Sequence, residues 1–157
     1  MRLTRFSDIG LRVLIYLARA GEARGPVTVA EIAGQFNVPV NHLVKVVGHL
    51  ARAGWVRATR GRNGGLRLAV DAATLKVGTV LRELEGDAEV VDCVGTACVL
   101  TDNCKLRGAL AAGMRAFYDS LDQYTLARIT DGTTGEQIVR MHQRFIDTGA
   151  LARPTSP

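Results

Sequence analysis

The three cysteines of the sequence lie within twelve residues, as Cys93, Cys98 and Cys104. Cysteine thiolates are ligands for zinc and for iron–sulphur clusters. Structural zinc sites usually contain cysteine pairs separated by about two to four residues and have four protein ligands. Here four and five residues separate the three cysteines, and no second pair follows. The residues therefore favour an iron–sulphur cluster over zinc, and zinc over chemically inert cysteines.

No histidine near the cysteines completes such a site. The sequence predicts that His142, far along the chain, is a surface residue on the last and weaker helix. His42 and His49 belong to a basic helix, and we expect them to face nucleic acid rather than a metal. The missing ligand is therefore expected to be a carboxylate, a small thiol, water or a group from another subunit.

Positive charge is concentrated in the first half of the chain. No acidic residue lies between Glu31 and Asp71, whereas the same interval contains six Lys or Arg residues. Such one-sided charge is costly for a compact fold unless a polyanion neutralises it, so it predicts nucleic-acid binding. No apolar run is long enough to span a bilayer, and the N-terminus lacks the features of a signal peptide. We expect a cytoplasmic protein with no membrane contact, in which cysteines stay reduced.

The basic segment has the pattern of a helix-turn-helix. Thr4 is expected to cap a helix that runs to about Ala20. Thr28 and Glu31 have the spacing of a capping box, which begins a second, short helix. A third helix, predicted over 40–53, turns apolar residues inward and polar and basic residues outward. Two short helices joined by a tight break, the second one basic, are typical of a helix-turn-helix.

A β-hairpin is predicted directly after the third helix. Residues 55–60 and 66–69 have the pattern of two strands, and the turn Asn63-Gly64-Gly65 is expected to supply positive φ angles. A hairpin in this position is a wing, whose arginines would contact phosphates or the minor groove. The candidate DNA contacts are Thr28, Asn41, His42, Lys45, His49, Arg60, Arg62 and Asn63.

The second half of the chain contains a candidate dimerisation helix. Residues 77–84 have helical apolar spacing, and a long helix is predicted over 104–124. This helix is longer than a small core requires, so we expect its apolar stripe to pair with a second copy in a homodimer. Thr133 and Glu136 have the spacing of a capping box for a last helix, and the end of the chain is expected to be disordered. The stripe consists of Leu106, Leu110, Met114, Phe117 and Leu121.

These elements predict a mainly α fold with a small β-hairpin wing, that is, a winged helix-turn-helix plus a long dimerisation helix. The expected division is a DNA-binding domain over 1–72, a cluster-binding loop and dimerisation helix over 73–130, and a C-terminal helix with a tail over 131–157. No acid–base constellation points to an enzyme. An electron-transfer protein would explain a cluster, but it would not need the acid-free basic segment.

Four parts of the sequence resemble the Rrf-type winged-helix regulators: the opening LTRFSDIGLRVLIYLA, the wing RGRNGGLRL, the helix KVGTVLRELEG and the three-cysteine loop. The resemblance covers about residues 1–130. Within that family, the cysteine spacing and the residues leading to Cys93 are similar to those of the nitric-oxide-sensing repressors. The family's regulators of iron–sulphur homeostasis have a histidine three residues after the third cysteine, where this chain has Arg107.

The resemblance implies that the three cysteines ligate a 4Fe–4S cluster and that Asp8 of the other subunit is the fourth ligand. It also implies that Arg12 and Glu85 support this site. A homodimeric transcriptional repressor would then bind double-stranded operator DNA and release it when nitric oxide nitrosylates the cluster. The alternatives are a regulator of iron–sulphur cluster supply or redox state, and a zinc-stabilised winged-helix regulator.

Overall fold

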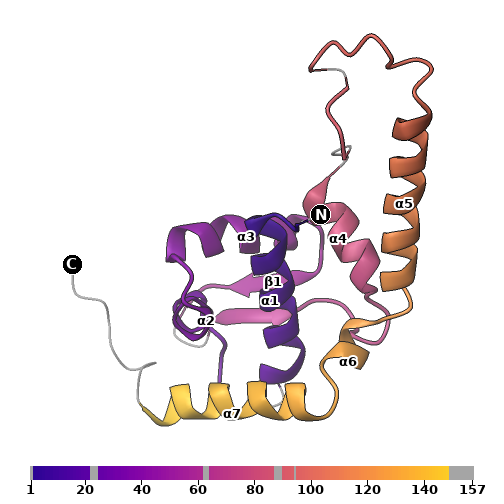
Figure 1. Ribbon diagram of the computed structural model, residues 1–157. Coiled ribbons are helices and arrows are strands. Elements are labelled where there is room, and N and C mark those ends of the chain that lie inside the picture. The colour runs from indigo at the N-terminus through magenta and orange to yellow at the C-terminus, as the bar shows by residue number, and fades with distance from the viewer. Residues whose placement is uncertain (1, 22–24, 62–63, 87–89, 94, 149–157) are drawn as a thin grey trace.

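A computed structural model describes the chain except for residues 1, 22–24, 62–63, 87–89, 94 and 149–157. The described chain is mainly helical, and two short strands form one antiparallel hairpin, so the predicted fold class is confirmed (Figure 1). No described helix is both long and apolar enough to cross a membrane. The elements are α1 (Arg5–Ala20), α2 (Val29–Phe36), α3 (Val40–Arg52), β1 (Val56–Thr59), β2 (Gly65–Leu68), α4 (Val77–Glu85), α5 (Lys105–Leu121), α6 (Leu126–Ile129) and α7 (Thr133–Asp147).

Side-chain caps begin the first two helices, as the sequence predicted. Thr4 Oγ1 accepts the Ser7 N–H at 3.2 Å at the start of α1. At the start of α2, Thr28 Oγ1 accepts the Glu31 N–H at 3.1 Å, and Glu31 Oε2 accepts the Thr28 N–H at 3.3 Å. Helix α2 ends at Asn37, whose φ of 51° is left-handed. This reversal turns the chain so that α3 begins after a short break.

Helix α1 is the centre of the hydrophobic core. Its Val13, Leu14 and Tyr16 have no exposed surface, and α3 turns the apolar face predicted for it onto this helix. The same cluster includes Leu84 of α4, Leu126 of α6 and Ile138 of α7, besides other residues. One hydrophobic core therefore takes side chains from all three segments into which the sequence was divided.

The wing lies where the sequence predicted it. Strands β1 and β2 pair antiparallel, with Val56 opposite Leu68. The Leu66 N–H donates to the Val27 carbonyl at 2.7 Å, which joins the hairpin to the segment before α2. The wing is thus hydrogen-bonded to the helix-turn-helix that it follows.

The turn of the wing differs from the prediction. The positive φ angle is at Gly61 (φ 106°), and neither Gly64 nor Gly65 has one. These two glycines are instead approached closely by other atoms: a Cβ on Gly64 would overlap the Thr59 carbonyl, and a Cβ on Gly65 would lie 2.7 Å from the Val27 carbonyl oxygen. Their small size, rather than their backbone freedom, is what the hairpin requires. Asn63 lies outside the described residues.

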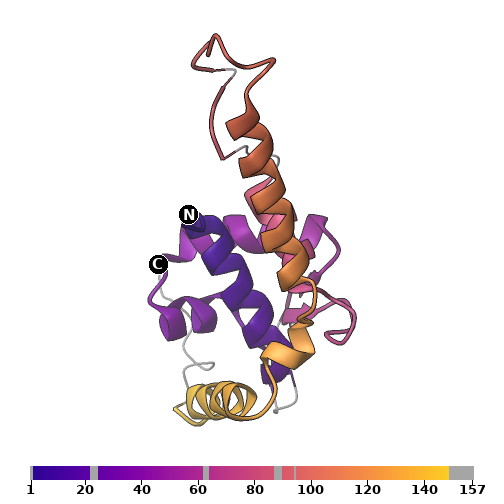
Figure 2. The ribbon, with the colours of Figure 1, turned by 45° about the vertical axis from the view of Figure 1, so that its right-hand side comes forward.

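Helix α5 forms an arm that extends beyond the core. Figures 1 and 2 show it beside α4 at its C-terminal end, with the cysteine loop carried at its far end. None of its residues is buried within the chain. It runs from Lys105 to Leu121, inside the predicted range, and Tyr124 lies in the following turn, where its carbonyl accepts the Val77 N–H at 2.9 Å.

Helix α7 crosses the base of the molecule in Figure 1 and packs against α1. The capping box predicted for it is wrong. Thr133 is the first residue of the helix, Gly132 with φ 57° is the N-cap, and no side-chain cap forms. Because the chain enters the helix through a positive φ angle, Thr133 is already inside the first turn and cannot cap it.

Candidate DNA interface and metal site

The start of α3 presents the polar residues predicted to read DNA. Asn41, His42 and Lys45 are exposed, and Asn41 Oδ1 accepts the His42 N–H at 3.0 Å. Beside them, Arg5 and Lys45 line a hollow of about 270 Å³ between α1 and α3, with an apolar floor that includes Phe6. The N-terminal part of a recognition helix is where base edges are usually contacted. The side chains predicted for that role are therefore accessible.

His49 has a different environment from the other predicted contacts on α3. Its Nε2 lies 3.1 Å from Glu83 Oε1 of α4, and its ring packs edge-on against Phe6 with centroids 5.5 Å apart. The side chain is half-buried. These contacts hold α3 against α1 and α4, so His49 has an intramolecular role whether or not it also reaches DNA.

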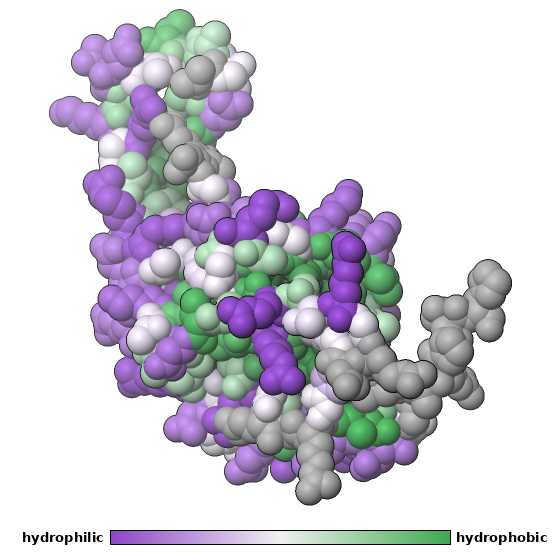
Figure 3. Space-filling view, turned by 180° about the vertical axis from the view of Figure 1, so that it is seen from behind, coloured by the Kyte–Doolittle hydropathy of each residue, from purple (hydrophilic) through white to green (hydrophobic). Residues whose placement is uncertain are grey.

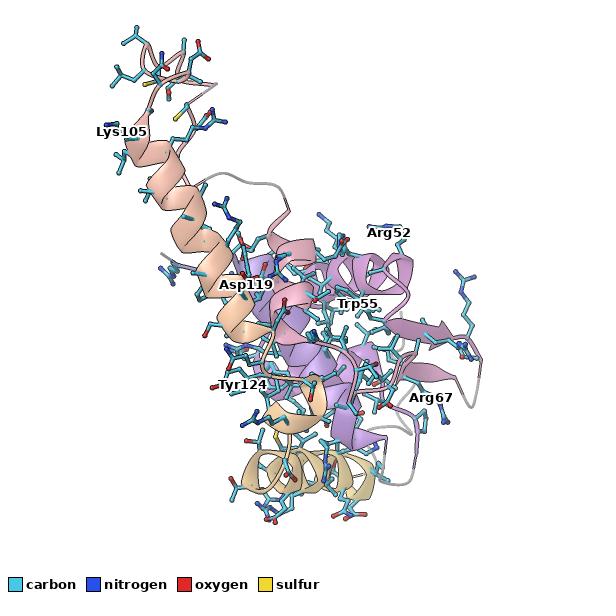
Figure 4. The ribbon with its side chains drawn as sticks, turned by 90° about the vertical axis from the view of Figure 1, so that its right-hand side faces the viewer. Arg52, Trp55, Arg67, Lys105, Asp119 and Tyr124 are labelled. Atoms are coloured by element: carbon cyan, nitrogen blue, oxygen red, sulfur yellow. The ribbon has the colours of Figure 1, made fainter. Side chains whose placement is uncertain are left out.

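Basic side chains continue from α3 along the wing. Arg60 and the cross-strand pair Arg57 and Arg67 are exposed, and Arg52 is exposed at the end of α3. Figure 4 shows Arg52 and Arg67, with Trp55 at the start of the hairpin between them. The other predicted contacts of the wing tip, Arg62 and Asn63, lie outside the described residues.

The predicted DNA contact at the start of α2, Thr28, is half-buried, and both its Oγ1 and its backbone N–H are used in the capping box.

Hydrogen bonds within the cysteine loop, most of them to backbone carbonyls, stabilise its conformation. The Cys98 N–H donates to the Cys93 carbonyl at 3.0 Å. The Thr101 hydroxyl lies 2.5 Å from the Cys98 carbonyl and 3.3 Å from the Cys93 carbonyl. Cys104 is the N-cap of α5, where its Sγ accepts the Arg107 N–H at 3.4 Å. The last of the three cysteines is therefore attached to the first turn of α5.

The donor set suits an iron–sulphur cluster in its chemistry: three soft thiols lie on one loop, with one of them at a helix N-terminus. Cys93 is buried and the other two cysteines are half-buried. Within the described ranges, no three His, Cys, Asp or Glu side chains are arranged around a common point. The three cysteines share one loop, but the described chain does not bring their side chains together as a ligand set.

The residues predicted to support the cluster lie near the start of α1. Asp8 Oδ1 accepts the Arg12 Nε–H at 2.9 Å, one helical turn away, and both side chains are about half exposed. Glu85 Oε1 accepts the Thr4 N–H at 2.9 Å and the Thr4 hydroxyl at 3.2 Å. The structure thus pairs Asp8 with Arg12 and Glu85 with the cap of α1, but it does not bring them to the three cysteines of the same chain.

Polar contacts attach the arm helix α5 to α4. Arg82 donates to Asp122 Oδ2 at 2.6 Å and to Asp119 Oδ1 at 2.8 Å, and the Thr79 N–H donates to Asp122 Oδ1 at 2.7 Å. Burial would raise the pKa of the Asp122 carboxyl, but the hydrogen bonds and charge from Arg82 and Thr79 outweigh it, so that pKa is lower than usual. The hydrogen bond to Asp122 in turn raises the pKa of Arg82.

The predicted dimerisation stripe is accessible along the arm. Leu106 is 63% exposed and the other members are half-buried. Val99 and Leu100 of the cysteine loop are 97% and 61% exposed, and Figure 3 shows hydrophobic surface at the far end of the arm. Apolar side chains that one chain leaves uncovered to this extent are typical of a protein–protein interface.

The prediction that His142 is a surface residue is wrong. It has no exposed surface, and its Nδ1 lies 2.5 Å from Oε1 of Glu31, which is equally buried. The same oxygen accepts the Tyr16 hydroxyl at 2.5 Å. The sequence does contain a signal for this burial: Ile138 and His142 are four residues apart, so they share a helix face. Because histidine is polar, it was not assigned to the buried face.

The comparisons with known proteins agree with this architecture. A family model described as "Rrf2: Iron-dependent Transcriptional regulator" matches residues 3–132. CymR of Staphylococcus aureus, in its oxidized form, is 29% identical with a TM-score of 0.65, and the alignment covers 85% of this chain and 98% of that one.

Two further solved structures are similar over most of their length. CymR of B. subtilis, described as the global cysteine regulator, is 29% identical with a TM-score of 0.66, and the alignment covers 82% of this chain and 95% of that one. IscR of T. potens is 26% identical with a TM-score of 0.62, and the alignment covers 82% of this chain and 85% of that one. Helix α7 lies beyond the residues that the family model matches.

Proposed function

Because the chain belongs to the Rrf2 family of transcriptional regulators, we propose that it is a homodimeric repressor of the NsrR type, which senses nitric oxide through a 4Fe–4S cluster. Members of this family are DNA-binding regulators and not enzymes. The winged helix-turn-helix supplies the DNA-binding surface.

The observation that carries the proposal is the placement of the three cysteines. They occupy one loop at the end of an arm whose helix is buried nowhere within the chain, and the last of them caps that helix. A ligand held by these thiols would fix the loop and the start of α5 together. Loss of that ligand would release the loop and the start of α5. Both lie next to the apolar stripe that is proposed to join two copies.

In this proposal Cys93, Cys98 and Cys104 hold the cluster, and Asp8 from a second copy of the chain is the fourth ligand. When bound, the cluster would supply an iron with a weakly held oxygen ligand, at which nitric oxide can react. Arg12 holds the Asp8 carboxylate in position from one turn along α1. A carboxylate that bridges two copies would make the contact between them depend on the cluster.

The contacts around α1 provide a route from the loop to the DNA-binding surface. Glu85, at the end of α4 and before the loop, binds the cap of α1 through Thr4. Helix α1 in turn packs against α3, and His49 of α3 contacts Phe6 of α1. A dimer that binds two half-sites one helical turn apart is sensitive to small shifts of its recognition helices. Coupling of about 1–3 kcal/mol is enough for a 5- to 150-fold change in affinity.

A second candidate is a regulator of iron–sulphur cluster supply or redox state, and the similarity to IscR favours it. Arg107 argues against this alternative, because the homeostasis regulators of the family have a histidine at that position. The backbone N–H of Arg107 donates to Cys104 Sγ, a hydrogen bond that a histidine at this position could also make. A zinc-stabilised regulator is a third candidate, since three thiols also suit zinc.

The test is release of DNA by nitric oxide. A duplex selected from a random-sequence pool with the anaerobically purified protein serves as the probe. Nitric oxide should release the duplex from the wild type, whereas an iron chelator alone should act much more slowly. Release by the chelator with no response to nitric oxide would favour sensing of cluster supply. A Cys93→Ala variant serves as the control and should not respond to nitric oxide.

A further inference from the structure

Three polar side chains from three helices meet inside the protein. They are Tyr16 of α1, Glu31 of α2 and His142 of α7, and each has a relative exposure of 0%. We refer to them as the Glu31 cluster. Two of its members belong to the DNA-binding half of the chain, whereas His142 comes from the helix that the family model does not match.

The carboxylate of Glu31 accepts every hydrogen bond in the cluster. Its Oε1 lies 2.5 Å from both the Tyr16 hydroxyl and His142 Nδ1, and its Oε2 accepts the Thr28 N–H at 3.3 Å. Three donors and the N-terminal end of α2 stabilise a buried negative charge. The pKa of the Tyr16 hydroxyl is raised by burial and by Glu31, so it stays protonated and donates.

The geometry also defines the state of the imidazole. Because Glu31 Oε1 is an acceptor, His142 carries a proton on Nδ1. Its Nε2 is buried and has no hydrogen-bond partner in the described part of the chain. The hydrogen bond from Nδ1 to Glu31 is therefore the only one that the described residues offer this imidazole.

Helix α7 contacts the helix-turn-helix at a second point. Gln35 of α2 donates to the Met141 carbonyl at 3.3 Å, one residue before His142. The rings of Tyr16 and His142 pack edge-on with centroids 6.4 Å apart, and Tyr16 packs in the same way against Phe36 at 5.8 Å. Both ends of α2 are therefore held: Glu31 is in its first turn, and Phe36 is its last residue.

We propose that His142 is a positioning residue for DNA binding, which acts by holding α2 through Glu31. Helix α2 packs on α3, which carries the predicted base contacts, and Glu31 belongs to the capping box that fixes the first turn of α2. Without the imidazole, the buried carboxylate lacks one of its donors, and arrangements in which α2 is displaced become more populated. The apparent affinity for DNA falls in proportion to the population that keeps α2 in place. This inference depends on DNA binding and not on the cluster.

The experiment compares three variants on the selected duplex, well below their melting temperatures. His142→Leu keeps the bulk of the side chain but removes the donor, whereas His142→Asn places an amide N–H where Nδ1 lies. Gln143→Ala changes an exposed neighbour on α7 and is the control. We expect about tenfold weaker binding by His142→Leu, equal to about 1.4 kcal/mol. Binding by His142→Asn should stay within about twofold of wild type, and amide exchange in residues 29–36 should rise only in His142→Leu.

Equal affinity of His142→Leu and wild type, with only a lower melting temperature, would overturn the inference, because His142 would then stabilise the fold without positioning α2. Failure of His142→Asn to restore binding would overturn it as well. If His142→Leu does not fold, Tyr16→Phe removes a different donor from the same oxygen and should weaken binding in the same direction. If the wild type itself selects no duplex, DNA binding fails, and that outcome is distinct from a failure of the inference.

Discussion

The Thr4 N–H donates a hydrogen bond to Glu85 Oε1 at 2.9 Å, so the cap of the first helix is fastened to the last residue of α4. Thr4 lies one turn before Asp8, the proposed fourth ligand, and Glu85 lies shortly before the cysteine loop. The contact therefore joins α4, which precedes the cysteine loop, to α1 of the same chain. The proposed cluster would join the loop to α1 of a second copy, so α1 would be linked to both.

Replacing Glu85 with alanine removes the acceptor of this hydrogen bond. Because both groups are near the surface, we expect a loss of about 1 kcal/mol or less in the free energy of unfolding. The larger effect should be on the response to nitric oxide. When the same fraction of the cluster has been lost, less DNA should be released from Glu85→Ala than from the wild type. Glu85→Gln keeps an acceptor and serves as the matched control. If the same loss of cluster releases the same fraction of DNA from the wild type and from Glu85→Ala, this contact is not part of the signalling route.

Replacing Asp8 with alanine tests the fourth ligand. The ion pair with Arg12 is about half exposed, so its loss should change stability by only about 0.5 kcal/mol. We expect Asp8→Ala to retain the cluster on its three cysteines but to react with nitric oxide at a different rate, measured by stopped-flow absorption. Arg12→Gln breaks the same ion pair and keeps the carboxylate. An unchanged rate in Asp8→Ala would exclude Asp8 as a ligand.

Charges on the apolar stripe of α5 should separate the dimer. None of the residues of this helix is buried within one chain, so Leu106→Glu with Leu110→Glu should leave the fold of the monomer intact. We expect a monomer by sedimentation, with an unchanged circular dichroism spectrum and much weaker DNA binding. Ala112→Glu places a charge elsewhere on the exposed surface of the same helix and should remain dimeric. A dimer that survives the double substitution would place the interface elsewhere.

The attachment of the arm should depend on pH through Asp122. A carboxyl whose pKa is lowered on folding contributes stability above its unfolded value, and loses it as the pH falls through the folded value. For Asp122 the ordinary value is 3.8 and the folded value is lower. Asp122→Asn should therefore melt at a lower temperature than wild type at neutral pH, and the two curves should meet in acid below pH 3.8. A constant difference across this range would contradict the role of the carboxylate.

Local signals in the sequence predicted the DNA-binding half well. Threonine caps, the tight break between α2 and α3 and the apolar spacing on α3 each depend on residues within a few positions of one another, and the structure confirms them. The capping box at Thr133 failed because Gly132 adopts a positive φ angle, which the spacing of Thr133 and Glu136 does not reveal.

Contacts between distant residues could not be predicted in the same way. Glu31 and His142 are 111 residues apart, and nothing local indicates that a polar ring on α7 has a buried carboxylate opposite it. The same limit applies to His49, whose place on a basic helix suggested DNA, whereas its Nε2 lies against Glu83 of α4. The cysteine spacing predicts a metal site, but it does not indicate the fourth ligand, which we propose is Asp8 of a second copy.

The most direct test of the central claim is the metal content of the protein purified without oxygen. The absorption spectrum should show the broad band of a thiolate-ligated cluster, with about four iron and four acid-labile sulphide per chain. Cys98→Ala should lose both the band and the iron. Protein that remains colourless after anaerobic reconstitution, or that contains about one zinc per chain, would contradict sensing of nitric oxide by a cluster.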